Sequence, residues 1–294
     1  MLSDADMATE AAGSRAPARL ALAVLMLALC CLAPSVAGAA SYVSLGDSYT
    51  SGIGIAPQSG VADCGQSGAN YPHLTAASLG LLLTDVSCAG ASTANMTVAQ
   101  YADQPPQFDA LTATTDVVSL SIGGNDNNFF ASTVGYCTWS DAGDVANIGA
   151  PCKKHFGSSL RTQIAQDGEA IGGAIARIRV LSPHAKVFVI GYPDLLPRHG
   201  NCFASLGWTS GDYRFFDGLE REYNSVLKGR ARANGAVFVE TYKSSVGHDL
   251  CQPVGTRWME PLNGAEGAAL HPNAGGARSQ AFAVEHAMVT AGIG

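Results

Sequence analysis

Several signatures of catalysis and cofactor binding are absent from this 294-residue sequence. No C-x-x-C pair follows residue 39 and no H-E-x-x-H occurs, which leaves a zinc site weakly supported. The absence of G-x-S-x-G argues against an α/β-hydrolase nucleophile elbow. No G-x-x-x-x-G-K-[ST] phosphate loop is present, and Gly52-Ile53-Gly54 lacks the third glycine of a dinucleotide fingerprint. We therefore expect neither a metal nor an organic cofactor.

Charged residues are also sparse. They make up 14% of the chain, and the formal net charge is -7. A nucleic-acid-binding protein needs a basic face to neutralise phosphates, so nucleic acid is excluded as the expected partner. The hydrophobic share of 47% is sufficient for a sizeable core and argues against disorder.

The first 39 residues predict a secretory signal peptide. Arg15 and Arg19 precede an apolar run over residues 20–32, and residues 37–39 (Ala-Gly-Ala) fit a cleavage site. The run is shorter than the ~20 residues that span a bilayer. Two alternatives stay open: an uncleaved membrane anchor, and a lipoprotein attached through a cysteine near the end of the run. The prediction is a secreted protein.

The cysteine count agrees with export, since an even number of cysteines in an exported chain is typical of disulfides. Six cysteines follow the predicted cleavage site: Cys64, Cys88, Cys137, Cys152, Cys202 and Cys251. Six cysteines allow fifteen pairings. We favour the pairing of nearest neighbours: Cys64–Cys88, Cys137–Cys152 and Cys202–Cys251. Each such bridge would stabilise the fold by a few kcal/mol.

No repeat or linker divides residues 40–294, which we interpret as one domain. Apolar runs predict strands at 42–45, 82–86, 116–122, 186–191 and 236–240. Helical patterns lie at 71–79, 159–181, 213–233 and 275–289. This alternation predicts a parallel sheet with helices on both faces. Ligands of such sheets bind beyond the carboxyl ends of the strands.

Four short blocks fall at those expected ends. They are Leu45-Gly46-Asp47-Ser48-Tyr49, Cys88-Ala89-Gly90-Ala91, Gly123-Gly124-Asn125-Asp126 and His271-Pro272-Asn273. Any one of them could be a simple turn, because glycine, aspartate, asparagine and serine favour turns. Four in order, each after a predicted strand or before the last helix, indicate a shared site.

In order and spacing the blocks resemble those of the GDSL or SGNH hydrolases, a family named for four separated residues. The matching residues are Ser48, Gly90, Asn125 and His271. The resemblance covers the whole of residues 40–294, and the cysteine layout is similar to the secreted actinobacterial branch, in which three local disulfides recur. It implies a three-layer α/β/α sandwich with a five-stranded parallel sheet.

The chemistry of these residue types agrees with the resemblance. A serine hydroxyl needs a base to remove its proton during attack, and a histidine suits that task near neutral pH. We therefore expect Ser48 as nucleophile and His271 as base. The resemblance implies three oxyanion donors, namely the Ser48 N–H, the Gly90 N–H and the Asn125 amide, which would stabilise the charge on the attacked carbonyl.

One family feature is missing. Many members carry an aspartate three residues before the histidine, whereas this chain has Ala268 there. Glu266 is a weak substitute for it. By resemblance to the secreted branch, we predict a Ser48–His271 dyad in which the carbonyl of Ala269 or Ala268 orients the ring.

Several other residues are expected to have structural roles or to line the site. We expect Asp47 to hold loop geometry and Asp126 to cap a helix. The three tryptophans at 139, 208 and 258 are expected in the core. Phe129 and Phe130 are the best candidates for the wall of an acyl pocket.

Together these points predict a secreted carboxylic ester hydrolase, of esterase or lipase type, that forms an acyl-Ser48 intermediate. Lipid or phospholipid esters are the first expected substrates, with transient contact to a lipid surface, and the protein is expected to be a monomer. Two alternatives remain: an acetylesterase acting on acetylated carbohydrate, and a secreted binding protein without turnover.

Overall fold

The computed structural model describes residues 38–144 and 146–294, without the side chains of residues 203 and 204. Ala39–Gly294 form one compact unit. The predicted signal peptide, residues 1–39, lies outside the described residues except at its end. Within the described ranges, no helix has the length and apolar character that a membrane crossing requires.

A parallel sheet of five strands forms the centre of this unit, as predicted. In spatial order its strands are β2 (Leu82–Asp85), β1 (Ser41–Gly46), β3 (Val117–Ser121), β4 (Lys186–Ile190) and β5 (Val237–Val239). Every residue of β3 is buried. A central parallel strand is covered on both faces, which explains its continuous apolar sequence.

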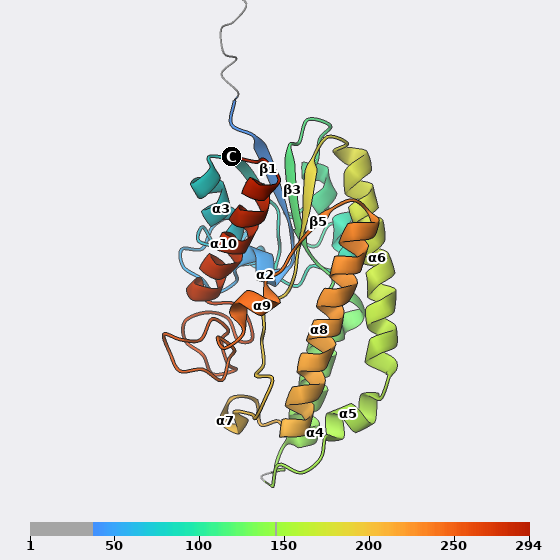
Figure 1. Ribbon diagram of the computed structural model, residues 1–294, viewed down its shortest axis with the longest axis vertical. Helices are drawn as coiled ribbons and strands as arrows, with labels where there is room; N and C mark the ends of the chain where they lie inside the picture. The colour runs from blue at the N-terminus through green and yellow to red at the C-terminus, as the bar shows by residue number, and fades with distance from the viewer. Residues whose placement is uncertain (1–37, 145) are drawn as a thin grey trace, which may run out of the picture. The chain divides into compact units, whose positions relative to one another are not determined.

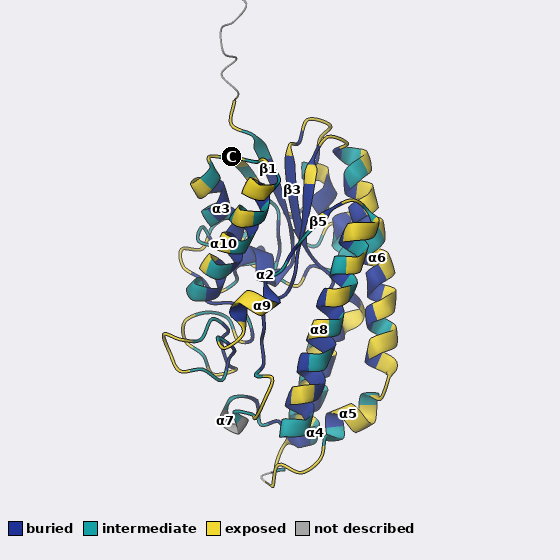
Figure 2. Ribbon diagram, in the orientation of Figure 1, coloured by how far each residue is buried: buried dark blue, intermediate teal, exposed yellow. Residues whose placement is uncertain are grey.

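Helices cover both faces of the sheet (Figure 1). On one face lie α3 (Tyr71–Leu79) and α10 (Ala274–Thr290); on the other lie the two long helices α6 (Ser159–Leu181) and α8 (Ser210–Ala233). Each layer buries its own apolar cluster against the strands, while the outer sides of the helices are exposed (Figure 2). The predicted three-layer α/β/α sandwich is confirmed.

The sequence did not predict the shorter helices. They are α2 (Ser48–Ser51), α4 (Phe129–Asp141), α5 (Pro151–Phe156), α7 (Phe203–Leu206) and α9 (Tyr242–Ser245), together with four 3-10 turns at Ala62–Cys64, Thr93–Met96, Gln107–Ala110 and Asp126–Asn128. Helix α4 is the largest omission. It buries Phe129, Thr133 and Cys137 at helical spacing. Its Trp139 is 73% exposed, so the expectation that this tryptophan lies in the core is wrong.

Polar caps define where the helices next to the strand ends begin. Asp47 caps α2 by accepting from the Tyr49 N–H, and Asn273 caps α10 by accepting from the Gly275 and Gly276 N–H groups. A side-chain cap satisfies N–H groups that have no partner within the helix. Because Asn273 follows His271 by two residues, this cap also fixes where the histidine segment meets α10.

The six described cysteines form three disulfides between sequence neighbours: Cys64–Cys88, Cys137–Cys152 and Cys202–Cys251. The second of these joins α4 to α5. The first joins the turn Ala62–Cys64 to the segment that follows β2. None of the six cysteines lies in a strand of the sheet, so each bridge links segments that no sheet ladder holds together.

One carboxyl group in the core has no hydrogen-bond partner on either oxygen. Asp194, in the segment after β4, is fully buried, and no described residue donates to its carboxylate. Burial raises its pKa to about 7, and the nearby carboxylates of Asp249 and Asp217 add to the shift, whereas the neighbouring Tyr242 hydroxyl and Arg198 oppose it. The neutral form therefore dominates in the folded protein under mildly acidic conditions.

This burial predicts how stability changes with pH. A folded-state pKa above the unfolded value means that the native state holds the proton longer, so stability falls as pH rises from ~4 to ~7. Asp194→Asn removes this titration and keeps the side-chain shape. Urea unfolding at pH 5 and pH 8 should show a larger stability gain for the variant at pH 8. An equal difference at both pH values would contradict the assignment.

Candidate active site

The four sequence blocks meet at the carboxyl edge of the sheet. Ser48 opens α2 directly after β1, Gly90 follows β2, Asn125 follows β3, and His271 precedes α10. All four line one cavity of about 290 Å³. Parallel strands end at the same edge, which is why residues up to 223 positions apart in sequence become neighbours here.

Ser48 and His271 form a hydrogen-bonded pair. The distance between His271 Nε2 and Ser48 Oγ is 2.7 Å, and His271 Nδ1 lies 2.7 Å from the carbonyl oxygen of Ala269. A carbonyl only accepts, so Nδ1 carries the ring proton and Nε2 is left to accept the serine proton. The carbonyl of Ala268 has another role, since it accepts from the His271 backbone N–H at 3.2 Å.

Glu266 forms no hydrogen bond with the ring of His271 in the structure. Its carboxylate lies 3.9 Å from the guanidinium of Arg257, and its N–H donates to Glu260. Burial lowers the pKa of His271 below 6.5, and the hydrogen bond to Ala269 opposes this shift. The ring is therefore neutral at pH 7, as a general base must be.

The histidine segment has a strained backbone. Leu270 has a φ of +61° and is a buried, non-glycine residue. Such a conformation costs on the order of 1–3 kcal/mol and persists only where surrounding contacts impose it. One contact is the hydroxyl of Tyr49, which donates to the Leu270 carbonyl at 2.8 Å. The residue after the serine thus holds the residue before the histidine, and the Tyr49 ring lies 5.1 Å from the His271 ring.

A second tyrosine connects two further strand ends. The Tyr192 hydroxyl donates to Asp47 Oδ2 at 2.5 Å and accepts from the Gly124 N–H at 3.0 Å. Asp47 also accepts from the Tyr49 N–H, and burial raises the pKa of its carboxyl to about 7. Tyr192, in the loop after β4, therefore fixes the distance between the segment that carries Ser48 and the segment that carries Asn125. Asp47 has the structural role that the sequence indicated.

The three groups implied as oxyanion donors lie around the same cavity. Ser48 is the first residue of α2, so its N–H has no partner within the helix. No described residue accepts from the Gly90 N–H. Asn125 donates one amide hydrogen to the Ala91 carbonyl at 2.9 Å, which leaves its second hydrogen for another acceptor. Three donors around one cavity suit a substrate atom that gains negative charge.

Asp126 does not cap its own helix. Its two carboxylate oxygens accept from the N–H and the hydroxyl of Thr93, at 2.7 and 2.8 Å, and the cap position is occupied by Asn125. The expectation of a helix cap is therefore wrong. Thr93 is the first residue of the turn Thr93–Met96, so its N–H has no partner within that turn, and the carboxylate of Asp126 from the neighbouring loop supplies one.

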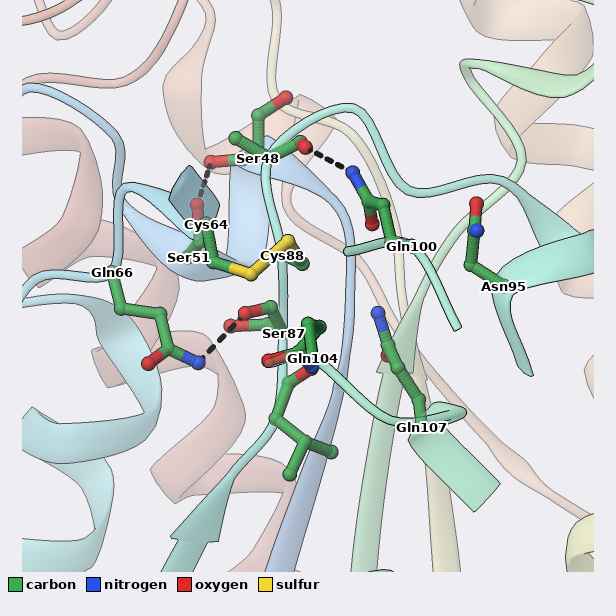
Figure 3. Close-up of a disulfide and its surroundings, with 12 residues drawn as sticks. Ser48, Ser51, Cys64, Gln66, Ser87, Cys88, Asn95, Gln100, Gln104 and Gln107 are labelled. Carbon is green, nitrogen blue, oxygen red and sulfur yellow. Dashed lines mark hydrogen bonds between the residues drawn. A yellow bond between two sulfur atoms is a disulfide. The ribbon is translucent and has the colours of Figure 1, made fainter. Parts of the chain in front are cut away.

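Side chains of glutamine support the same segment, and sequence reasoning missed them. Figure 3 shows four of them around the Cys64–Cys88 disulfide. The bonds, with the donor first, are Gln66 to the Ser87 carbonyl (2.7 Å), Gln100 to Ala89 (2.7 Å), Gln104 to Val86 (3.0 Å) and Gln107 to Gly46 (2.9 Å). The spacing of residues 100, 104 and 107 is compatible with one face of a helix. It does not predict that the side-chain amides donate to backbone carbonyls.

The rest of the cavity wall is mainly apolar. Phe129 and Phe130 of α4 form part of it, as expected, together with Phe216, Leu219 and Tyr223 of α8. Glu220 is the polar exception. Its Oε2 accepts from the Leu195 N–H at 3.2 Å, and burial raises its pKa well above the usual range, which favours the neutral form of the carboxyl. A largely aromatic wall suits an aliphatic chain.

Comparison with known proteins finds matches along most of the chain. Residues 44–278 match the GDSL-like Lipase/Acylhydrolase family. The chain is 40% identical to Lipase 2 of Streptomyces coelicolor over 258 residues, which is 86% of each chain.

Two solved structures have a TM-score of 0.70 to this chain. One is a phospholipase A1 from Streptomyces albidoflavus, 28% identical, with 86% of this chain and 99% of that chain covered. The other is an extracellular lipase from Streptomyces rimosus, 27% identical, with coverage of 86% and 100%.

The Tyr49 hydroxyl provides a test of the strained histidine segment. Tyr49→Phe removes one hydrogen bond to Leu270 and keeps the ring. We expect kcat for p-nitrophenyl butyrate to fall up to about tenfold, because a hydrogen bond of about 1 kcal/mol no longer holds the segment. Tyr42→Phe is the matched control, since it removes a buried tyrosine contact to Ser119 inside the sheet core. Equal kcat values for both variants would refute the role of Tyr49.

Proposed function

The chain belongs to the GDSL-like lipase/acylhydrolase family of ester hydrolases, and we propose that it cleaves lipid acyl esters by way of an acyl-Ser48 intermediate. The observation that carries the proposal is the 2.7 Å contact between His271 Nε2 and Ser48 Oγ at the mouth of an apolar cavity. Relatives named lipase and phospholipase A1 support the lipid substrate class.

The reaction follows from the positions of these groups. Ser48 Oγ attacks the ester carbonyl carbon while its proton passes to His271 Nε2. The negative charge formed on the carbonyl oxygen is stabilised by the Ser48 N–H, the Gly90 N–H and the Asn125 amide. The C–O bond to the alcohol breaks, and the alcohol leaves with the proton from His271. Water then attacks the acyl-serine, gives its proton to His271, and releases the acid and Ser48.

The orienting group in this proposal is the carbonyl of Ala269, with Ala268 holding the backbone of the histidine. A carbonyl fixes the tautomer but carries no full charge, so it stabilises the imidazolium less than a carboxylate would. The dyad depends correspondingly more on geometry, which the strained turn at Leu270 and its bond from Tyr49 provide.

The dyad makes a direct prediction. Ser48→Ala and His271→Ala should each lower kcat by at least ~10⁴-fold, whereas Glu266→Gln should keep it within about twofold. Because only the neutral ring accepts a proton, kcat/KM should rise with pH through a midpoint below 6.5 and be complete at neutral pH. Loss of most turnover in a folded Glu266→Gln variant would exclude the dyad.

A series of p-nitrophenyl esters, from acetate through butyrate and octanoate to palmitate, tests the substrate class in the same experiment. The apolar wall predicts a preference for octanoate or palmitate. A preference for acetate would favour the alternative of an acetylesterase acting on carbohydrate. Absence of turnover above Ser48→Ala, with the disulfides intact, would favour a binding protein without catalysis.

We also propose that the protein is secreted and acts as a monomer, with residues 1–39 removed as a signal peptide and residues 40–294 forming the mature domain. Three disulfides support an oxidising destination. The extracellular lipase of Streptomyces rimosus, a structural relative over its full length, supports the same location.

Contact with a lipid surface is proposed through the side that carries α4 and α5. Trp139 is 73% exposed on α4, the helix whose first turn supplies Phe129 and Phe130 to the cavity. Tryptophan is favoured at membrane interfaces because its ring is apolar and its N–H polar. A nearby hollow between α5, α6 and α8 is lined by Lys153, Arg161, Arg214 and Arg221, of which Arg161 and Arg221 form salt bridges with carboxylates of α8.

Trp139→Ala should weaken partition onto phosphatidylglycerol vesicles at least about tenfold, because an indole that inserts into the lipid surface contributes on the order of 1.5–3 kcal/mol. Hydrolysis of soluble p-nitrophenyl butyrate should not change. Phe282→Ala is the matched control, because Phe282 is 74% exposed but lies on α10, across the sheet. Equal partition of the two variants in a sedimentation assay would refute this contact surface.

A further inference from the structure

The Gly90 N–H lies in a tight turn whose closing hydrogen bond is compatible with two backbone forms. The Ala91 N–H donates to the Cys88 carbonyl at 3.0 Å, which closes a four-residue turn with Ala89 and Gly90 at its centre. Gly90 has a φ of +79°, the value of the third residue in a type II turn. A type I turn keeps the same closing bond but reverses the central peptide and has φ of about -90° at that position.

Nothing in the covalent structure selects between the two forms. Glycine occupies positive and negative φ about equally well, so the peptide between Ala89 and Gly90 can rotate as a unit. The backbone on either side is fixed, because the Ala89 N–H donates to Cys64 at 2.9 Å and the Ala91 N–H closes the turn. The orientation of this one peptide must therefore come from a contact to its own carbonyl or N–H.

That contact comes from Gln100. Its Nε2 donates to the Ala89 carbonyl oxygen at 2.7 Å. In a trans peptide the C=O and the next N–H point in opposite directions. Gln100 lies outside the residues that line the cavity, whereas Gly90 lines it. A carbonyl turned toward Gln100 thus places the Gly90 N–H on the side of the cavity and Ser48.

The environment of Gln100 indicates that this bond is its main polar contact. Its Oε1 is buried and has no hydrogen-bond partner among the described residues. The Cβ of an alanine at position 90 would lie 3.6 Å from Gln100 Nε2, an ordinary contact distance, so the space at the turn does not select its form.

We propose that Gln100 is a positioning residue that holds the turn at residues 88–91 in its type II form and thereby aims the Gly90 N–H at the substrate oxyanion. The inference rests on the proposed function, because it assumes that Gly90 is an oxyanion donor. Gln100 acts through a backbone peptide and does not touch the substrate.

The test compares Gln100→Leu and Gln100→Glu with Gln104→Leu. We expect both Gln100 variants to lose about 10²-fold in kcat, the usual effect of removing one oxyanion donor, with KM changed less than threefold. Gln100→Glu should be the slower, because a carboxylate repels the Ala89 carbonyl. Gln104→Leu removes an equivalent bond, to Val86, from a peptide outside the turn, so it should lose stability but keep kcat.

The inhibition constant Ki of a trifluoromethyl ketone is a second measurement, and a purely structural role of Gln100 would not change it. The ketone forms an oxyanion on reaction with Ser48, so its Ki should rise by the same factor by which kcat falls. Gly90→Ala, which disfavours the positive φ, should reproduce the loss. The double variant Gly90→Ala/Gln100→Leu should be no slower than the slower single variant, because both changes disable the same donor.

Three results would overturn the proposal: a kcat for Gln100→Leu within threefold of the unmodified protein, an equal loss in Gln104→Leu, or additive losses in the double variant. Should the Gln100 variants fail to fold, Gly90→Ala decides, because kcat and Ki retained there exclude any role for the turn form. Ser48→Ala separates the failure of this proposal from failure of the proposed function. If Ser48→Ala is inactive while Gln100→Leu is fully active, only the role of Gln100 is lost.

Discussion

Backbone polar groups lose their ladder partners where the strands of a parallel sheet end, and Ser48, Gly90 and Asn125 all follow such ends. A buried N–H or C=O without a partner is costly, so other groups must satisfy it. Here side chains do so: Tyr49 binds the Leu270 carbonyl, Gln100 the Ala89 carbonyl, and Tyr192 the Gly124 N–H. Each of these bonds also orients a group that the proposed chemistry needs. The same side-chain hydrogen bonds therefore satisfy the backbone groups at the strand ends and position the residues of the site.

The same arrangement would allow the proposed Ser48–His271 dyad to function without an acidic third member. The ring of His271 is partly buried, and the resulting desolvation lowers its pKa below 6.5 and keeps it neutral at pH 7. A neutral base needs the correct tautomer and a fixed position, and the Ala269 carbonyl together with the strained turn at Leu270 supplies both. What a carboxylate would add is stabilisation of the imidazolium during the reaction. The site relies instead on the preorganisation of peptide groups around the cavity.

The sequence predicted the parts of this protein that depend on local pattern. Strands, long helices and the four blocks are visible in it because a buried parallel strand and an amphipathic helix have recognisable periodicities. Helix α4 was missed because its composition is mixed and apolar residues do not mark one face. Asp126 and Trp139 were assigned wrongly, because their environments depend on Thr93 and on the position of α5, which local sequence does not reveal. The Gln100 and Tyr49 bonds span 11 and 221 positions, and no periodicity encodes them.

The walls of the cavity and its reactive groups come from different parts of the fold. Its polar groups stand on loops at strand ends that are tied to one another, whereas its aromatic walls come from α4 and α8. Substitutions at Phe130 or Phe216 can therefore reshape the space for the acyl chain and leave the hydrogen bonds of the loops unchanged. Because of this division, substitutions in two helices can change the substrate preference while the reactive groups on the loops keep their positions. A library restricted to those helix faces is accordingly the efficient way to redirect the enzyme toward other acyl chains.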